Sequence, residues 1–228
     1  MDIVVVSIGG SVLIPDDNDF EYLSGLAELL VDLSSGAKLY IVVGGGRISR
    51  YYIELGRKFG TDERILDEMG VDVTRLNARL LISALSGKAN DLPAETVEEA
   101  ADLGNDHSIV VMGGTTPGHT TDGVAASLAE LVKADRIVNA TAVDGVYNKD
   151  PNRYDDAEKI EKMSFEELLE CCKVSDWKAG PSNVFDAMGA EIIARNEIPL
   201  LVVKGRDLEA LESAIRGESF SGTTVGGE

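Results

Sequence analysis

Short, almost wholly apolar runs rich in β-branched residues recur along the chain and alternate with longer amphipathic stretches. Runs of about four to eight such residues are typical of strands that are buried on both faces. Strands of this kind form parallel sheets covered by helices on both sides, so this alternation constrains the fold strongly. The expected strands lie at residues 3–8, 38–43, 108–112, 136–140 and 199–203.

The stretches between these runs show helical periodicity, as in the series Leu23, Leu26, Leu30 and Leu33. Alternating strands and helices predict an α/β fold, with helices on both sides of a mostly parallel sheet. The 228 residues form one domain or two closely fused lobes, with a weak boundary near 131–136. Helices are expected at residues 20–33, 48–59, 71–85, 97–103, 121–132, 164–172, 183–194 and 208–215.

The chain is strongly acidic, with 40 Asp and Glu residues against 21 Lys and Arg and a formal net charge of −19. This balance argues against a general nucleic-acid binder and against adhesion to anionic membranes, because both need basic patches. An anionic substrate must therefore meet a locally positive site made of backbone N–H groups, a few cations and a metal ion. The acidic surface also suggests a protein adapted to a salt-rich cytoplasm.

Two further features indicate a cytoplasmic protein. Cys171 and Cys172 are adjacent in an expected helix, which suits a reduced thiol pair better than a disulfide framework. The apolar N-terminal segment lacks a basic region, and no apolar run reaches the ~18–20 residues that span a bilayer.

Three of the expected strands end in glycine: Gly9-Gly10, Gly44-Gly45-Gly46 and Gly113-Gly114. Glycine at a strand-to-helix turn lets the backbone approach a phosphate at a helix N-terminus. A single Gly-Gly pair is explained as well by the dihedral angles of the turn. Three such corners together favour a binding site for a polyphosphate.

Two common nucleotide-binding motifs are absent from the sequence. The dipeptide Gly87-Lys88 is nearest to a P-loop, but Ile82 and Ala89 occupy positions that the motif reserves for Gly and Ser or Thr. No G-x-G-x-x-G follows the first expected strand, so a dinucleotide oxidoreductase is a poor second choice.

Side chains near the glycine corners suit phosphate and sugar recognition. Arg47 and Arg50 follow the glycine triplet, where a guanidinium can bind phosphate or form a surface salt bridge. Asp67, expected in a loop at 64–70, can accept hydrogen bonds from a sugar diol or cap a helix.

The segment TTPGHTTD at 115–122 clusters hydroxyl groups and one histidine before a helix. It fits a reader of anions and nucleobases, or a capped turn with Thr120 or Thr121 as the cap. A histidine metal site is not expected, because His119 has only His107 as a possible partner. The segment 141–151 forms either a ledge for adenine or a β-hairpin.

Together these segments resemble the amino acid kinase family, and within it the archaeal type of uridylate kinases. The motifs that carry the resemblance occur in order over nearly the whole chain: IGGSVL at 8–13, VVGGGRISRYYIE at 42–54, VMGGTTPGHTTD at 111–122, VDGVYNKDP at 143–151 and SGTTV at 221–225.

The resemblance implies one αβα domain over residues 1–228 with a mostly parallel eight-stranded sheet, an acceptor part at 1–132 and an ATP part at 133–228. It implies transfer of the ATP γ-phosphoryl group to UMP, with Mg²⁺ carried by the nucleotide phosphates and no metal site on the protein. It also implies a homohexamer, a trimer of dimers.

The implied ATP contacts are Gly9, Gly10, Ser11, Gly46, Arg50, Thr141, Tyr147 and Asp150. The implied UMP contacts are Gly45, Asp67, Thr115, Thr116, Pro117, Gly118, His119, Thr120 and Thr121.

Two residues are candidates for the catalytic charges: Lys178 as a cation near the transferred phosphoryl group and Asp144 as an organiser of charge. A solvated lysine and a turn aspartate are the structural alternatives. Many relatives carry a lysine on the first strand as K-x-S-G or K-x-G-G, and this chain has none there. Ala142 stands where relatives often have Asn.

Two alternatives remain open at the level of sequence. The first is another small-acceptor kinase of the same fold, for isopentenyl phosphate or acetylglutamate. The hydroxyl-rich segment and Asp67 favour a polar nucleotide acceptor over an isoprenoid. The second is a nucleotide-binding sensor or storage protein without turnover, because a fold does not dictate function.

Overall fold

The computed structural model describes residues 1–15, 19–149, 153–173 and 185–227. Its central feature is a twisted sheet in the order β3-β2-β1-β4-β8-β9-β7, in which β9 runs antiparallel to β8 and the other pairs are parallel. The strands of this sheet are β1 (Asp2–Ile8), β2 (Ala37–Val43), β3 (Ile109–Met112), β4 (Arg136–Thr141), β7 (Lys162–Met163), β8 (Leu200–Lys204) and β9 (Gly222–Val225).

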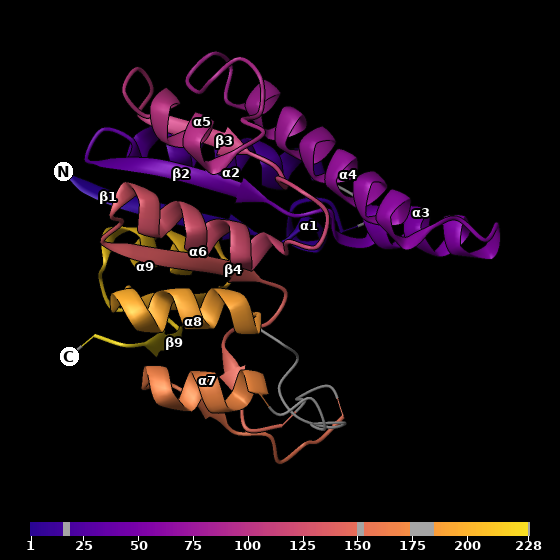
Figure 1. Ribbon diagram of the computed structural model, residues 1–228. Coiled ribbons are helices and arrows are strands. Elements are labelled where there is room, and N and C mark those ends of the chain that lie inside the picture. The colour runs from indigo at the N-terminus through magenta and orange to yellow at the C-terminus, as the bar shows by residue number, and fades with distance from the viewer. Residues whose placement is uncertain (16–18, 150–152, 174–184, 228) are drawn as a thin grey trace.

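Helices cover both faces of the sheet, as the alternating pattern predicts (Figure 1). On one side lie α1 (Gly10–Leu13), α2 (Asp19–Leu33), α4 (Glu63–Ala84) and α9 (Leu208–Arg216). On the other side lie α5 (Val97–Leu103), α6 (Thr121–Val132), α7 (Phe165–Lys173) and α8 (Ala187–Asn196). The expected three-layer αβα sandwich is confirmed. No helix in the described part of the chain is long and apolar enough to cross a membrane.

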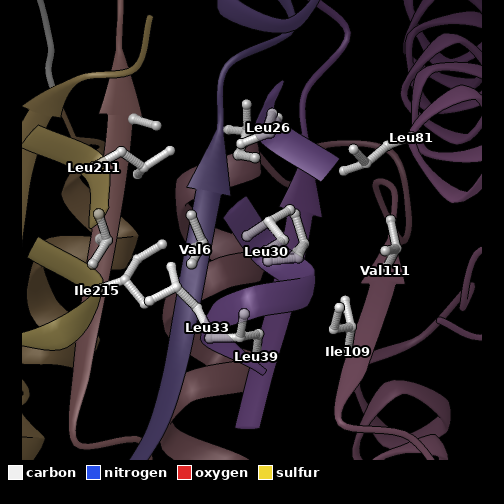
Figure 2. Packing of buried hydrophobic residues seen from close by; sticks show 14 of the residues in the cluster. Val6, Leu26, Leu30, Leu33, Leu39, Leu81, Ile109, Val111, Leu211 and Ile215 are labelled. Atoms are coloured by element: carbon white, nitrogen blue, oxygen red, sulfur yellow. The ribbon is translucent and has the colours of Figure 1, made fainter. Parts of the chain in front are cut away.

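The core divides into two apolar clusters, one on each face of the sheet. Figure 2 shows the first cluster, in which Leu26, Leu30 and Leu33 of α2 pack toward Val6 and Leu39 of the central strands. Since the strands are buried on both faces, alternate residues of β1 and β2 contribute to different clusters. This explains why the strands are apolar throughout.

The sheet differs in detail from the expected eight strands. The main sheet of the described residues has seven, and β5 (Val146–Tyr147) pairs separately with β6 (Lys159–Ile160) in an antiparallel ribbon. The hairpin alternative for the segment 141–151 is therefore not formed among its described residues, because the partner of β5 lies outside the segment, at 159–160.

Helix α3 (Gly46–Lys58) packs along α4, and the two helices extend beyond the carboxyl ends of β1 and β2 (Figure 1). Helix α4 begins at Glu63, eight residues before the expected start, because Asp62 caps it by accepting a hydrogen bond from the N–H of Arg64. Leu66 in the added turns is fully buried, and a Cβ on Gly56 of α3 would lie 2.4 Å from it. Packing against α3 therefore holds the segment helical.

Candidate active site

A cavity of about 380 Å³ opens at the carboxyl ends of β1, β2 and β4. In open α/β sheets this edge carries the strand-to-helix turns that bind ligands. The residues that line it are Ser7, Gly9, Gly10, Ser11, Val12, Gly44, Gly45, Gly46, Arg50, Thr120, Thr121, Asp122, Asn139, Ala140, Thr141, Ala142 and Val143.

The first two glycine corners interlock at the base of this cavity. A Cβ on Gly10 would lie 2.4 Å from the carbonyl oxygen of Gly44, and a Cβ on Gly46 would lie 2.3 Å from the carbonyl carbon of Gly10. Gly46 also has φ +63°, which glycine adopts more easily than other residues. Glycine is thus required here because two backbone segments meet and form one continuous surface.

Three helices begin at this surface. The first residues of α1, α3 and α6 are Gly10, Gly46 and Thr121, and all three line the cavity. Helix N-termini offer unpaired N–H groups and a positive dipole end, which favour phosphate. Arg50 adds a cation, and its Nη2 donates a hydrogen bond to Oγ of Ser11 at 2.9 Å. Among the described lining residues, Arg50 is the one arginine or lysine.

A buried polar cluster closes the inner wall. Ser7 of β1 and Asn139 of β4 are paired in the strand register and are 1% and 4% exposed. The Ser7 hydroxyl donates a hydrogen bond to Oδ1 of Asp122 at 3.3 Å. Burial, and then the neighbouring Asp186 carboxylate, raise the pKa of Asp122 to about 7, while the Ser7 hydrogen bond acts in the opposite direction. The Asp122 carboxyl thus changes charge near neutral pH.

The N-termini of α6 and α8 are joined through their caps. Thr120 accepts a hydrogen bond from the N–H of Gly123, and Asp186 accepts one from the N–H of Gly189. The Thr120 hydroxyl also donates to Oδ2 of Asp186. This bond fixes the start of α6 relative to α8 and holds the Asp186 charge close to Asp122.

Asn77 of helix α4 supports the turn formed by Gly44, Gly45 and Gly46. Asn77 is 2% exposed, and its Nδ2 donates to the carbonyl oxygens of Gly44 at 2.9 Å and Gly45 at 3.3 Å. Its amide therefore satisfies carbonyl groups that the glycine turn removes from the sheet.

Many of the predicted site residues meet in this cavity. Those that line it are Gly9, Gly10, Ser11, Gly45, Gly46, Arg50, Thr120, Thr121 and Thr141. Residues Asp150 and Lys178 lie outside the described part of the chain.

The acceptor residues expected at 115–119 lie beside the cavity and not in its described lining. Thr116, Pro117, Gly118 and His119 form an exposed turn, in which the hydroxyl of Thr116 lies 2.9 Å from Nδ1 of His119. Gly113 and Gly114, the third glycine corner, pack against α4. Only the far end of this segment, at Thr120 and Thr121, reaches the cavity.

Asp67 is exposed within α4, so the loop expected at 64–70 is wrong. The cap of this helix is Asp62, not Asp67. Asp67 likewise does not belong to the described lining of the cavity.

Asp144 and Tyr147 form a separate ionic cluster. The Tyr147 hydroxyl donates to Oδ1 of Asp144 at 2.6 Å, and Nζ of Lys159 lies 3.2 Å from Oδ2. The hydrogen bond from Tyr147, followed by the interactions with Lys159, keeps the pKa of Asp144 below its usual value despite partial burial. Neither Asp144 nor Tyr147 is among the described lining residues.

Comparison with known proteins agrees with this geometry. The family model described as "Amino acid kinase family" matches residues 2–204. The chain belongs to the amino acid kinase family. A protein named uridylate kinase from Methanocaldococcus jannaschii is 46% identical over 91% of this chain and 93% of its own. Another from Thermococcus sibiricus is 42% identical over 97% of this chain and 98% of its own.

A solved structure of the amino acid kinase fold gives the same result. The crystal structure of uridylate kinase from Archaeoglobus fulgidus has a TM-score of 0.87 and 40% identity, covering 99% of this chain and all of that chain. The mostly parallel sandwich described above is therefore the fold of this family.

Ser7 occupies the first-strand position at which the sequence pattern K-x-G-G would place a lysine. In the spacing K-x-G-G, the residue two positions before Gly9 is Ser7. Its hydroxyl reaches Asp122 at the cavity wall. The chain thus has a neutral hydrogen-bond donor at this position.

Sequence reasoning missed Asp122 and Asn77. Asp122 was visible as the acid that ends the TTPGHTTD segment, directly before an apolar helix. Asn77 carries no local signal, because its role depends on packing of α4 against a turn more than 30 residues away.

Proposed function

We propose that this protein is a UMP kinase, which transfers the γ-phosphoryl group of ATP to UMP to give UDP and ADP in pyrimidine nucleotide biosynthesis. The observation that carries the proposal is the cavity where three helix N-termini, two interlocked glycine corners and Arg50 meet. Relatives named uridylate kinase, 40–46% identical over more than nine-tenths of the chain, identify the acceptor.

The reaction needs positioning and charge neutralisation more than covalent chemistry by the protein. An oxygen of the UMP phosphate forms a bond to the γ-phosphorus of ATP, the bond from that phosphorus to the β–γ bridging oxygen breaks, and ADP leaves. The UMP phosphate is already anionic near neutral pH, so no general base is required. Backbone N–H groups of the glycine corners and Arg50 stabilise the charge on the transferred group.

Mg²⁺ fits this site as an ion held mainly by nucleotide phosphates. Among the described residues of the cavity wall, Asp122 offers a carboxylate, and Ser7, Thr141 and Asn139 offer hydroxyl and amide oxygens. These are the hard oxygen donors that Mg²⁺ prefers, and it commonly takes its other ligands from phosphates and water. When bound, the ion neutralises phosphate charge.

The allocation of the two nucleotides follows the predicted site. ATP is assigned to Gly9, Gly10, Ser11, Gly46, Arg50 and Thr141, with Tyr147 and Asp150 at its nucleoside. UMP is assigned to Gly45, Asp67 and the residues from Thr115 to Thr121. Lys178 and Asp144 remain proposed catalytic residues, the latter through its ion pair with Lys159. We assign residues 1–132 to the acceptor part and 133–228 to the ATP part of one domain, and residues from both ranges line the cavity.

We also propose a homohexamer, built as a trimer of dimers. An apolar groove between α2 and α4 supports a contact between copies, because it exposes Phe20 and Leu80, which are 80% and 45% accessible. Sedimentation at micromolar concentration tests the assembly, and a monomer would contradict it. We place the enzyme in the cytoplasm, in keeping with two free cysteines.

An acceptor panel tests the function. ADP release is measured with Mg-ATP and UMP, CMP, dUMP, AMP, isopentenyl phosphate or acetylglutamate. We expect preferential turnover of UMP. Preference for isopentenyl phosphate or acetylglutamate would identify another kinase of this fold, and tight ATP binding without turnover of any acceptor would indicate a sensor or storage protein.

A further inference from the structure

Arg75 of α4 holds the backbone of the segment that follows β3. Its Nε donates to the carbonyl oxygen of Gly114 at 3.3 Å, and its Nη2 donates to that of Thr115 at 3.1 Å. The remaining nitrogen, Nη1, pairs with Glu95 at 3.0 Å. One guanidinium thus ties α4 to two successive peptide groups and to the segment that flanks β3.

Gly113 and Gly114 allow this segment to lie in close contact with α4. A Cβ on Gly113 would lie 2.8 Å from the backbone nitrogen of Arg75, so only glycine fits there. The N–H of Gly114 donates to Oγ1 of Thr74 at 2.6 Å. Thr74 and Arg75 together hold both the amide and the carbonyl of Gly114 on the α4 side.

This arrangement determines where the next amide groups point. In a planar trans peptide, the C=O of one residue and the N–H of the next point in opposite directions. Because the carbonyls of Gly114 and Thr115 face Arg75, the N–H groups of Thr115 and Thr116 face away from α4. The segment then runs through the exposed turn to Thr120 and Thr121 at the cavity.

We propose that Arg75 is a positioning residue for the acceptor nucleotide: its fork on the Gly114 and Thr115 carbonyls aims the following N–H groups at the acceptor. This inference rests on the proposed function, since it takes the segment 115–121 as the UMP site. Arg75 itself does not touch the substrate. It acts by ordering two peptide groups before UMP binds, which lowers the cost of binding.

The geometry requires arginine and not a general cation. A planar guanidinium donates from several nitrogens in fixed directions, whereas a lysine ammonium is a point charge on a flexible stem. Lysine at position 75 can pair with Glu95 but cannot hold two adjacent carbonyls in the same way. Arg75→Lys therefore keeps the positive charge but loses the planar guanidinium, and Arg75→Met loses both.

The test measures dissociation constants for UMP and for ATP separately, by calorimetry on the full chain, with the melting temperature as a check on folding. We expect the Kd for UMP to rise about tenfold or more in both Arg75→Lys and Arg75→Met, with the Kd for ATP within about twofold of the wild type. Arg195→Lys is the matched control, because Arg195 also pairs with a carboxylate, Glu130 at 2.7 Å, but lies on α8. Its constants should not change.

The possible results are distinct. A normal Kd for UMP in Arg75→Lys would overturn the inference, because charge alone would then suffice. Equal losses of UMP and ATP binding would also overturn it, since they would indicate a general structural role. Wild-type protein that does not phosphorylate UMP would contradict the proposed function and this inference together, whereas active wild type with unchanged variants contradicts the inference alone.

Discussion

Asp122 lies on the cavity wall, and the charge of its carboxyl group depends on pH near neutrality. Its carboxyl hydrogen-bonds to Ser7 and lies near Asp186, and its pKa is raised to about 7. A raised pKa in the folded state means that ionisation of Asp122 opposes folding. The free energy of unfolding therefore falls as the pH rises from about 4 to 7 and is not affected further by this group above that range.

Asp122→Asn removes this charge and should stabilise the protein at pH 8, by ~4 kcal/mol at most for a shift of about three pH units. The gain should shrink by ~2–3 kcal/mol at pH 5, where the folded wild type already carries the proton. Urea unfolding at both pH values measures the difference. Asp156→Asn is the control: Asp156 is exposed and pairs with Lys149, so its removal should give no such gain. An Asp122→Asn effect independent of pH would contradict the assigned pKa.

Arg50 should contribute to phosphate binding and little to stability. It is exposed, and its Nη2 donates a hydrogen bond to the hydroxyl of Ser11 at the cavity. We expect Arg50→Met to raise the Kd for ATP by roughly 10- to 100-fold, since a charge-assisted contact to phosphate is lost. The free energy of unfolding should change by less than about 0.5 kcal/mol.

Arg57→Met is the matched control for Arg50→Met. Arg57 lies on the same helix, two turns further along, and pairs with Glu63. Calorimetric titration with ATP should give the wild-type constant for this variant. Equal weakening in both variants would show that helix α3, and not the Arg50 side chain, determines ATP affinity.

At the scale of single residues, the sequence predicted the residues that line the cavity better than those that support it. Arg50 and the glycines of the first two corners were identified because glycine and arginine at a strand end have a local meaning. Arg75 and Asn77 were not, because each acts on carbonyl groups 30 to 40 residues away. Asp67 was placed in a loop, because Gly70 and the neighbouring charged residues obscure the helical periodicity of this segment.

Among the elements, the turn between β2 and α3 has a strict steric requirement at Gly46. Gly46→Ala adds a Cβ that would lie 2.3 Å from the backbone of Gly10, at φ +63°. We expect it to destabilise the fold by about 3 kcal/mol or more and to abolish measurable ATP binding, because the two corners must separate. Thermal unfolding and ATP titration report the two effects.

Gly60→Ala separates backbone strain from the clash. Gly60 has φ +74°, yet a Cβ there would meet nothing within 4 Å. We expect a loss of only about 1 kcal/mol, from the strained φ alone, and normal ATP binding. If Gly46→Ala were as mild as Gly60→Ala, the interlocked corners would not be essential to the site.

The sequence predicted the long elements of the fold and missed the shortest ones. The five expected strands lie within one residue of those observed, because buried parallel strands give continuous apolar runs. Strands β5, β6 and β7 have two residues each and show no periodicity. Strand β9 was missed because Gly222 and two threonines occupy three of its four positions and leave no apolar run, although Thr223 is fully buried.

For the whole molecule, the net charge of −19 is the dominant electrostatic property. Repulsion among so many carboxylates destabilises the compact state, and salt screens it. We expect the melting temperature to rise by about 5 °C or more between 0.1 and 2 M KCl. Sucrose at matched osmolality is the control, since it is excluded from the protein surface without screening charge. A melting temperature that does not rise with KCl would remove the hypothesis of adaptation to a salt-rich cytoplasm.

The central claim is that the cavity joins ATP and UMP for direct phosphoryl transfer. The most direct test incubates the wild-type protein with Mg-ATP and UMP and quantifies all four nucleotides by chromatography over time. We expect UDP and ADP to appear in equal amounts as UMP and ATP disappear. ADP without UDP, or no ADP at all, would contradict it.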